Sequence, residues 1–206
     1  TIPHKIDIIP LLDKTSENVR EMGACNTLYR DGEKICGENT DVIGFTAPLR
    51  KRSLPPETRV LVLGAGGVSR AAIAGLRRLG LANITLTNRR KERAEALCNE
   101  FGLLCAPWEE RGDVPADLII NTTPLGMTGA QEHETPYPRA FQDNGIAYDL
   151  IYTPFQTRFL RDAAAAGWET VSGLDMFIGQ GDAQFHLWTG HHLPEEAITA
   201  VTSALY

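Results

Sequence analysis

The chain has 206 residues, enough for one sizeable domain or two small ones, and its 43% hydrophobic and 22% charged residues are typical of a globular protein. The formal net charge of -6, with no block of like charges, argues against a nucleic-acid surface, because phosphate binding needs a clustered basic face. The apolar stretches are far shorter than the roughly 20 residues that a bilayer span requires, and the first residues do not resemble a signal peptide. We therefore expect a soluble, cytoplasmic protein whose partner is a small molecule, with no nucleic-acid or membrane partner.

Cysteine and histidine residues give no sign of a disulfide-stapled or metal-bound fold. The cysteines form no C-x-x-C pair, and a chain of this size can build a core without disulfides. The five histidines show no spacing that would place several of them on one metal ion. We expect reduced, mostly buried thiols and no metal site.

The first part of the chain combines a helical pattern with a hairpin pattern. Apolar residues recur at helical spacing over residues 6–23, which predicts one amphipathic helix. Residues 26–39 predict two antiparallel strands, and the pair Asp31-Gly32 between them is a strong signal for a two-residue turn. Residues 50–59 contain two prolines and several charges, so they interrupt any periodic pattern and predict a domain boundary.

From residue 59 onward, short apolar runs alternate with helical periods. This rhythm predicts a parallel sheet with right-handed crossover helices, which is the doubly wound α/β (Rossmann) architecture. Residues 174–206 are expected to be helical, with Pro194 opening the last helix. The expected strands lie within 59–64, 83–88, 117–127 and 146–152, and the expected helices within 68–80, 91–102 and 157–168.

A glycine-rich turn joins the first of these strands to the first helix. Gly64, Gly66 and Ser69 fall at the spacing G-x-G-x-x-S, where a strict dinucleotide-binding fingerprint has a third glycine. Glycines let the backbone approach a pyrophosphate, and the positive end of the helix dipole favours its charge. A small residue at position 69 still permits close packing of helix and strand. The turn therefore predicts a bound dinucleotide.

The end of the second strand indicates which dinucleotide is bound. An acid at this position would hold the ribose hydroxyls of NAD, whereas this chain has Asn88, Arg89 and Arg90. Guanidinium groups can grip the oxygens of a 2′-phosphate in paired hydrogen bonds, and Arg93 lies one turn further on. We therefore expect NADP as the cofactor.

A nicotinamide enzyme also needs a site that holds an alcohol or carbonyl and moves a proton. A lysine near a carboxylate can do this, and Lys5, Asn26 and Asp41 are the candidates outside the nucleotide domain. On composition alone, any one lysine or aspartate is most often a surface charge, so these residues gain weight only from the motifs around them.

The sequence resembles the shikimate dehydrogenase family from Thr1 almost to the C-terminus. The family's T-x-P-x-K, G-A-x-N-T and N-T-D elements are similar to residues 1–5, 23–27 and 39–41. Its G-A-G-G-x-S-R element is similar to residues 64–70, and its N-R-x-x-x-R element is matched by Asn88, Arg89 and Arg93. The stretches NTTPLGM, YDLIYTPFQT and GLDMFIGQGDAQFHLWTG also look like family signatures.

The resemblance implies an NADP-dependent oxidoreductase that interconverts 3-dehydroshikimate and shikimate in aromatic amino-acid biosynthesis. Lys5 would transfer the proton and Asp41 would be its partner, both holding the ring hydroxyls. The other residues implied to bind the substrate are Thr1, Asn26, Tyr152 and Gln180. The residues implied to bind the cofactor are Glu17, Gly64, Ala65, Gly66, Gly67, Val68, Asn88, Arg89, Arg90, Arg93, Leu150 and Gly173, with Met176 either covering the same pocket or belonging to the core.

The implied domain organisation has two lobes. Residues 1–50 would form the C-terminal part of a substrate-binding domain, and residues 51–173 the Rossmann NADP-binding domain. Residues 174–206 would pack back on the substrate-binding domain. The active site would then be the cleft between the lobes, in a monomer or a homodimer.

Two departures from the family pattern keep alternatives open. Val42 stands where the family commonly has glycine after the catalytic acid, and this stiff side chain is expected to reshape the pocket wall. That change favours a quinate/shikimate dehydrogenase or a related enzyme with another substrate. Relatives also have a preceding segment with a Ser-x-Ser pair that grips the shikimate carboxylate, so an N-terminally incomplete chain or a non-catalytic NADP-binding module is a further interpretation.

Overall fold

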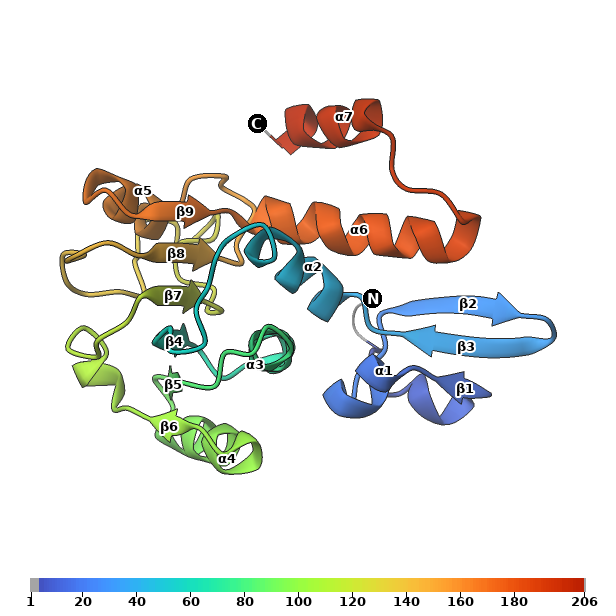
Figure 1. The fold of residues 1–206 in the computed structure, drawn as a ribbon, viewed down its shortest axis with the longest axis horizontal. Helices are drawn as coiled ribbons and strands as arrows, with labels where there is room; N and C mark the ends of the chain where they lie inside the picture. The colour runs from blue at the N-terminus through green and yellow to red at the C-terminus, as the bar shows by residue number, and fades with distance from the viewer. Residues whose placement is uncertain (1–3, 206) are drawn as a thin grey trace.

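The computed structural model describes residues 4–205, so Thr1 lies outside the described residues. Its centre is a six-stranded parallel sheet in the order β6-β5-β4-β7-β8-β9 (Figure 1). The predicted doubly wound α/β fold is therefore confirmed. The strands are β4 (Val60–Leu63), β5 (Ile84–Thr87), β6 (Leu104–Cys105), β7 (Leu118–Asn121), β8 (Ile146–Asp149) and β9 (Glu169–Val171).

Helices cover both faces of this sheet, which explains why its strands appear in the sequence as unbroken apolar runs. All four residues of β4 are buried, as expected for a parallel strand with helices on each side. One core lies under the helices α2, α3 and α4, and includes Phe45 and Ile73. A second core on the other face includes Phe159 and Trp168. The helices are α2 (Asp41–Leu49), α3 (Gly67–Arg78), α4 (Lys91–Phe101) and α5 (Arg158–Ala165).

The first residues form a separate three-stranded sheet in the order β1-β3-β2. The single helix predicted over residues 6–23 is wrong, because the segment contains a 3₁₀ helix (Ile9–Leu11), strand β1 (Lys14–Thr15) and helix α1 (Glu17–Met22). Pro10 has no N–H to donate to a helix, and the hydroxyl of Ser16 accepts a hydrogen bond from Val19 N, which starts a new helix.

The predicted hairpin is confirmed, with its turn one residue later than expected. Strands β2 (Thr27–Asp31) and β3 (Lys34–Glu38) are antiparallel, and Asp31 pairs with Lys34. The two-residue turn is therefore Gly32-Glu33, and Gly32 supplies the left-handed conformation with φ of 62°.

Helix α6 (Gly173–Thr189) leaves the parallel sheet and crosses α2 (Figure 1). Two glycines permit the close approach: a Cβ on Gly44 would lie 2.5 Å from the carbonyl oxygen of Met176, and one on Gly179 would lie 3.2 Å from Gly44 Cα. Near the C-terminal end of α6, the indole nitrogen of Trp188 donates a hydrogen bond to Leu28 O in β2 at 2.8 Å. This crossing places Asp41, at the start of α2, beside the middle of α6.

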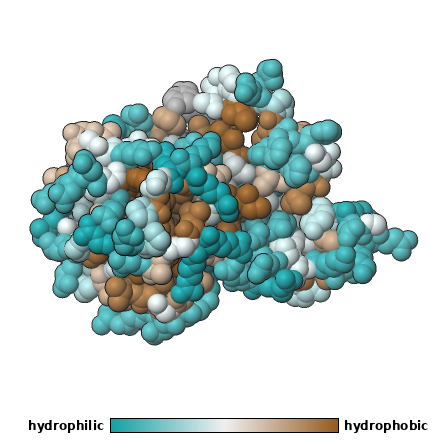
Figure 2. All heavy atoms as spheres, in the orientation of Figure 1, coloured by the Kyte–Doolittle hydropathy of each residue, from teal (hydrophilic) through white to brown (hydrophobic). Residues whose placement is uncertain are grey.

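The last helix, α7 (Glu195–Leu205), follows the turn after α6. Asp182 of α6 accepts hydrogen bonds from two residues of that turn, Leu193 N and His192 Nδ1. Hydrophilic residues cover much of the face shown in Figure 2, and apolar residues appear in the hollows between the elements. Across residues 4–205, no helix is both long and apolar enough to span a bilayer. All four cysteines are free thiols.

Candidate active site

A cavity of about 1050 Å³ lies between the N-terminal segment and the carboxyl ends of the parallel strands. Strand order reverses between β4 and β7, and the carboxyl ends of strands at such a switch point are where ligands bind in open α/β sheets. Many of the site residues predicted from the sequence meet here. Those lining the cavity are Lys5, Asp41, Gly67, Val68, Leu150, Tyr152, Gly173 and Gln180, together with Met176.

Lys5 and Asp41 form an ion pair at this cavity, although 36 positions separate them in the sequence. The distance from Lys5 Nζ to Asp41 Oδ2 is 2.7 Å. Their side chains are 27% and 15% exposed, so both groups are shielded yet still face the cavity. The carbonyl of Lys5 accepts a hydrogen bond from Cys25 N at 2.7 Å, which ties the segment that carries the lysine to the small sheet.

Two buried asparagines hold Asp41 in place. Asn26 Nδ2 donates to Asp41 Oδ1 at 2.8 Å, and the side-chain oxygen of Asn39 accepts from Asp41 N at 3.0 Å. Asn39 Nδ2 in turn donates to Ala24 O. The amide nitrogen of Asn26 also donates to Thr40 Oγ1, so this side chain helps to position the acid, and its predicted contact with substrate stays a prediction.

The opposite wall comes from the loop after β8 and from α6. The Tyr152 ring stacks on Phe177 with centroids 5.0 Å apart. A Cβ on Gly173 would lie 2.5 Å from the carbonyl oxygens of Leu150 and Ile151, so only glycine lets α6 begin this close to the strand end. Met176 is 8% exposed and contributes both to the cavity wall and to the core, so both interpretations of this residue hold.

A buried polar network joins the two loops that line the cavity. The carboxylate of Asp149, which is fully buried at the end of β8, accepts hydrogen bonds from Asn121 Nδ2, Ile151 N and Thr157 Oγ1 at 3.0, 3.0 and 2.6 Å. Asn121 Oδ1 accepts from Thr123 N at 2.9 Å. Burial raises the pKa of Asp149 from 3.8 to about 7.

The glycine-rich turn is shaped for a close backbone approach. Gly64 has φ of 116°, and a Cβ there would lie 2.4 Å from Thr122 Oγ1. Gly66 and Gly67 face open space, which side chains would otherwise occupy. Ser69 is small enough for close packing and also joins the turn to the loop after β7, because its hydroxyl accepts a hydrogen bond from Gly66 N at 2.9 Å and bonds to Thr122 Oγ1 at 2.7 Å.

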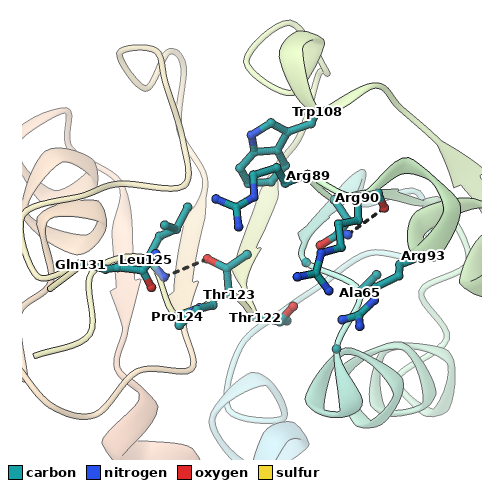
Figure 3. Close-up of a pocket in the computed structure, with 13 residues that line it drawn as sticks. Ala65, Arg89, Arg90, Arg93, Trp108, Thr122, Thr123, Pro124, Leu125 and Gln131 are labelled. Carbon is teal, nitrogen blue, oxygen red and sulfur yellow. Dashed lines mark hydrogen bonds between the residues drawn. The ribbon is translucent and has the colours of Figure 1, made fainter. Parts of the chain in front are cut away.

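A second, narrower cavity of about 240 Å³ continues from this turn to the end of β5 (Figure 3). Asn88, Arg89, Arg90 and Arg93 all line it, together with Gly64, Ala65 and Gly66. Across the described residues 4–205, none of these three guanidinium groups forms a salt bridge. The cavity therefore presents unneutralised positive charge beside a helix N-terminus, the setting that suits a phosphate.

Two residues singled out from the sequence line neither of these cavities. Glu17 was expected near the cofactor, but it begins α1, is exposed, and lines neither cavity. Val42 was expected to shape the pocket wall next to Asp41. Val42 itself is 1% exposed and lies in a core cluster with Met22, Ala71 and Ala74, of which Met22 and Ala71 line the larger cavity. An effect of Val42 on the pocket wall, through these neighbours, stays a prediction. On a helix, the residue after Asp41 faces about 100° away from it.

Across residues 4–205, no group of three or more His, Cys, Asp or Glu side chains is placed to hold a metal ion.

Comparison of the sequence with known proteins identifies the family. Residues 49–110 match the model for shikimate / quinate 5-dehydrogenase, and residues 173–201 match that for the shikimate 5'-dehydrogenase C-terminal domain. The chain is 55% identical over 210 residues to a shikimate dehydrogenase (NADP(+)) from Pelobacter propionicus, covering 100% of this chain and 75% of that relative. The chain belongs to the shikimate dehydrogenase family.

Solved structures of the shikimate dehydrogenase family share the fold. The shikimate 5-dehydrogenase from Thermus thermophilus, in complex with NADP(H) and shikimate, has a TM-score of 0.86 and 36% identity, covering 100% of this chain and 77% of its own. The quinate dehydrogenase from Corynebacterium glutamicum, in complex with NAD, also has a TM-score of 0.86, with 29% identity over 100% of this chain and 76% of its own.

Sequence reasoning missed several residues that line the cavities. In the larger cavity these include Asn39, Thr122, Thr123, Ile151 and Phe177, and in the smaller cavity Trp108, Leu125 and Gln131. The stretch NTTPLGM held a usable signal, because polar residues directly after a buried parallel strand lie at the ligand-binding edge. No comparable signal marks Phe177 or Trp108, whose positions depend on tertiary packing.

Proposed function

We propose that this protein is an NADP-dependent shikimate dehydrogenase that interconverts 3-dehydroshikimate and shikimate in aromatic amino-acid biosynthesis. The observation that carries the proposal is the Lys5–Asp41 ion pair, which faces a cavity bordered by the glycine-rich turn. An ion pair suited to proton transfer and a turn suited to a nucleotide thus border one cavity. The four reduced thiols fit the cytoplasmic location expected for such an enzyme.

The residues present fit NADP. Gly66 and Gly67 leave room for a pyrophosphate at the N-terminus of α3, and Arg89, Arg90 and Arg93 supply unpaired guanidinium groups for a 2′-phosphate. Leu150 and Gly173 would flank the nicotinamide in the larger cavity. When bound, the cofactor accepts or donates the hydride. The absence of an acid at the end of β5 favours NADP over NAD.

Lys5 and Asp41 would handle the substrate hydroxyls. The Lys5 amine would exchange the proton of the reacting hydroxyl, and Asp41, which holds the lysine in position, would also accept from ring hydroxyls. Asn26 fixes the orientation of the carboxylate and Asn39 holds the backbone N–H of Asp41, so the pair is preorganised before substrate enters. Tyr152 and Gln180 supply polar groups from the facing wall.

The proposed domain organisation has two lobes. Residues 1–50 and 174–206 would form the substrate lobe, joined by the α2–α6 crossing, and residues 51–173 the nucleotide lobe. Movement of one lobe against the other would close the cavity and exclude water before hydride transfer.

A second candidate is a quinate/shikimate dehydrogenase of relaxed specificity, which the likeness to the NAD-bound quinate dehydrogenase favours. The two are separated by measuring kcat/KM for shikimate and for quinate with each cofactor. We expect the highest value for shikimate with NADP. A preference for quinate and NAD would support the second candidate, and tight NADPH binding without any turnover would indicate a non-catalytic NADP-binding module.

A further inference from the structure

We propose that the indole of Trp108 forms the wall on which the adenine base of the cofactor stacks. The inference rests on the proposed NADP-dependent function and adds a specificity-determining contact to it. Trp108 opens the short 3₁₀ helix Trp108–Glu110 after β6, is half-buried, and lines the same narrow cavity as the three arginines.

The arrangement of the narrow cavity determines which part of the nucleotide reaches Trp108. In Figure 3, Arg90 and Arg93 lie near Ala65 of the glycine-rich turn, while Trp108 lies at the other end of the cavity beside Arg89. A pyrophosphate at the turn therefore places the ribose and its 2′-phosphate among Arg89, Arg90 and Arg93. The base, the next group along the molecule, then extends toward Trp108.

The indole is held in place before any ligand arrives. The guanidinium carbon of Arg111 lies 3.9 Å from the centroid of the Trp108 ring, and Arg111 Nε donates to Pro136 O at 2.6 Å. Burial of this guanidinium lowers the pKa of Arg111. Because a fixed cation covers one face of the ring, the indole is preorganised and loses little freedom when a base stacks on it.

The other walls suit a flat, neutral aromatic group. Leu125 and Gln131 lie across the cavity from Trp108 in Figure 3 and offer one apolar and one amide side chain. An adenine ring can stack on an indole and use an amide for its polar edge.

The test uses three variants in the protein with any natural flanking residues retained. Trp108→Ala removes the ring, Trp108→Phe keeps a smaller one, and Trp188→Phe is the matched control on the exposed end of α6 in the other lobe. Dissociation constants are measured for NADPH, for adenosine 2′,5′-bisphosphate and for reduced nicotinamide mononucleotide. Tryptophan fluorescence is recorded during each titration.

We expect Trp108→Ala to weaken NADPH and the bisphosphate by the same factor, about five- to 150-fold, the range of one base stacked on an aromatic side chain. Binding of the mononucleotide should not change, and Trp108→Phe should lose much less. The bisphosphate should quench fluorescence in the wild type and in Trp188→Phe but not in Trp108→Phe.

Unchanged bisphosphate binding in a folded Trp108→Ala variant would overturn the inference. If that variant does not fold, persistent quenching in Trp108→Phe would overturn it instead. A wild-type protein that binds neither NADPH nor the bisphosphate would contradict the proposed function itself, so the two failures are distinguishable.

Discussion

The buried carboxyl of Asp149 makes the stability of the protein depend on pH, and Asp149→Asn should remove that dependence. Its pKa rises from 3.8 in an exposed setting to about 7 in the fold, a difference of about three units. Each unit corresponds to about 1.4 kcal/mol, so ionised Asp149 destabilises the fold by about 4 kcal/mol.

The sign of the effect follows from where the proton is bound. At pH below 3.8 the carboxyl is protonated in both the folded and the unfolded chain, so it has no effect on stability. Between that pH and about 7, the folded chain retains a proton that the unfolded chain has lost, and the free energy of unfolding falls as pH rises. Above about pH 7, Asp149 is ionised in both the folded and the unfolded chain, and the free energy of unfolding stays lowered by the full amount.

The assay is thermal or urea unfolding of wild type and Asp149→Asn from acid to neutral pH. The side-chain oxygen of an asparagine can still accept hydrogen bonds from Asn121 and Ile151. Any effect of the altered hydrogen bonding that does not depend on pH cancels when the stability difference between variant and wild type is compared at the two ends of the pH range. The stability of the variant relative to wild type should rise by about 4 kcal/mol, or about 10 °C in Tm for a chain of this size.

Asp117→Asn is the matched control. Its hydrogen bond from Arg59 lowers the pKa of this exposed carboxyl, so the effect of that substitution should already be constant above about pH 5. A relative stability of Asp149→Asn that stays flat between pH 5 and 8 would refute the argument that burial dominates at this site.

Further predictions concern the cofactor, the acid and the packing. Arg89→Asp should weaken NADP binding at least tenfold in a calorimetric titration and leave NAD binding nearly unchanged. Each charge-assisted contact contributes about 1.5 to 3 kcal/mol, and only NADP carries the 2′-phosphate. Equal losses for NADP and NAD would mean that Arg89 does not contact that phosphate. Asp41→Asn should lower kcat and raise KM for shikimate, since it removes a charged acceptor and the counter-charge of Lys5 together; unchanged steady-state kinetics would exclude that role. Gly44→Val should destabilise the fold by about 1 to 3 kcal/mol in denaturant unfolding, because its side chain would overlap the Met176 carbonyl; a stability equal to wild type would show that α2 and α6 can separate freely.

The nucleotide lobe was largely predictable because its signals are local. Parallel strands buried on both faces appear as apolar runs, and the glycine turn follows the first of them directly. The short edge strands β6 and β9 were missed because two or three residues with exposed members carry no periodic pattern. The arginines at the end of β5 were correctly placed in one cavity because the register of a strand fixes where its end lies.

The substrate side was less predictable because it depends on contacts distant in sequence. Helix α2 was missed: it contains Gly44 and Pro48 and is buried on most sides, so it shows no amphipathic pattern. The inward direction of Val42 follows from that helix. Lys5 and Asp41 were brought together only through the resemblance to a family, since nothing local in either segment indicates the other. Their assigned roles remain predictions.

The Lys5→Met variant provides the most direct test of the central claim, that Lys5 moves the proton during shikimate oxidation. The measurement is the initial rate of NADPH formation from shikimate and NADP, with any natural flanking residues retained. Lys14→Met, which breaks an exposed ion pair with Asp31 in the same lobe, is the control. The account predicts that Lys5→Met loses about 10² to 10⁴ in rate while NADPH binding and the control stay near wild type. Wild-type turnover in Lys5→Met would contradict it.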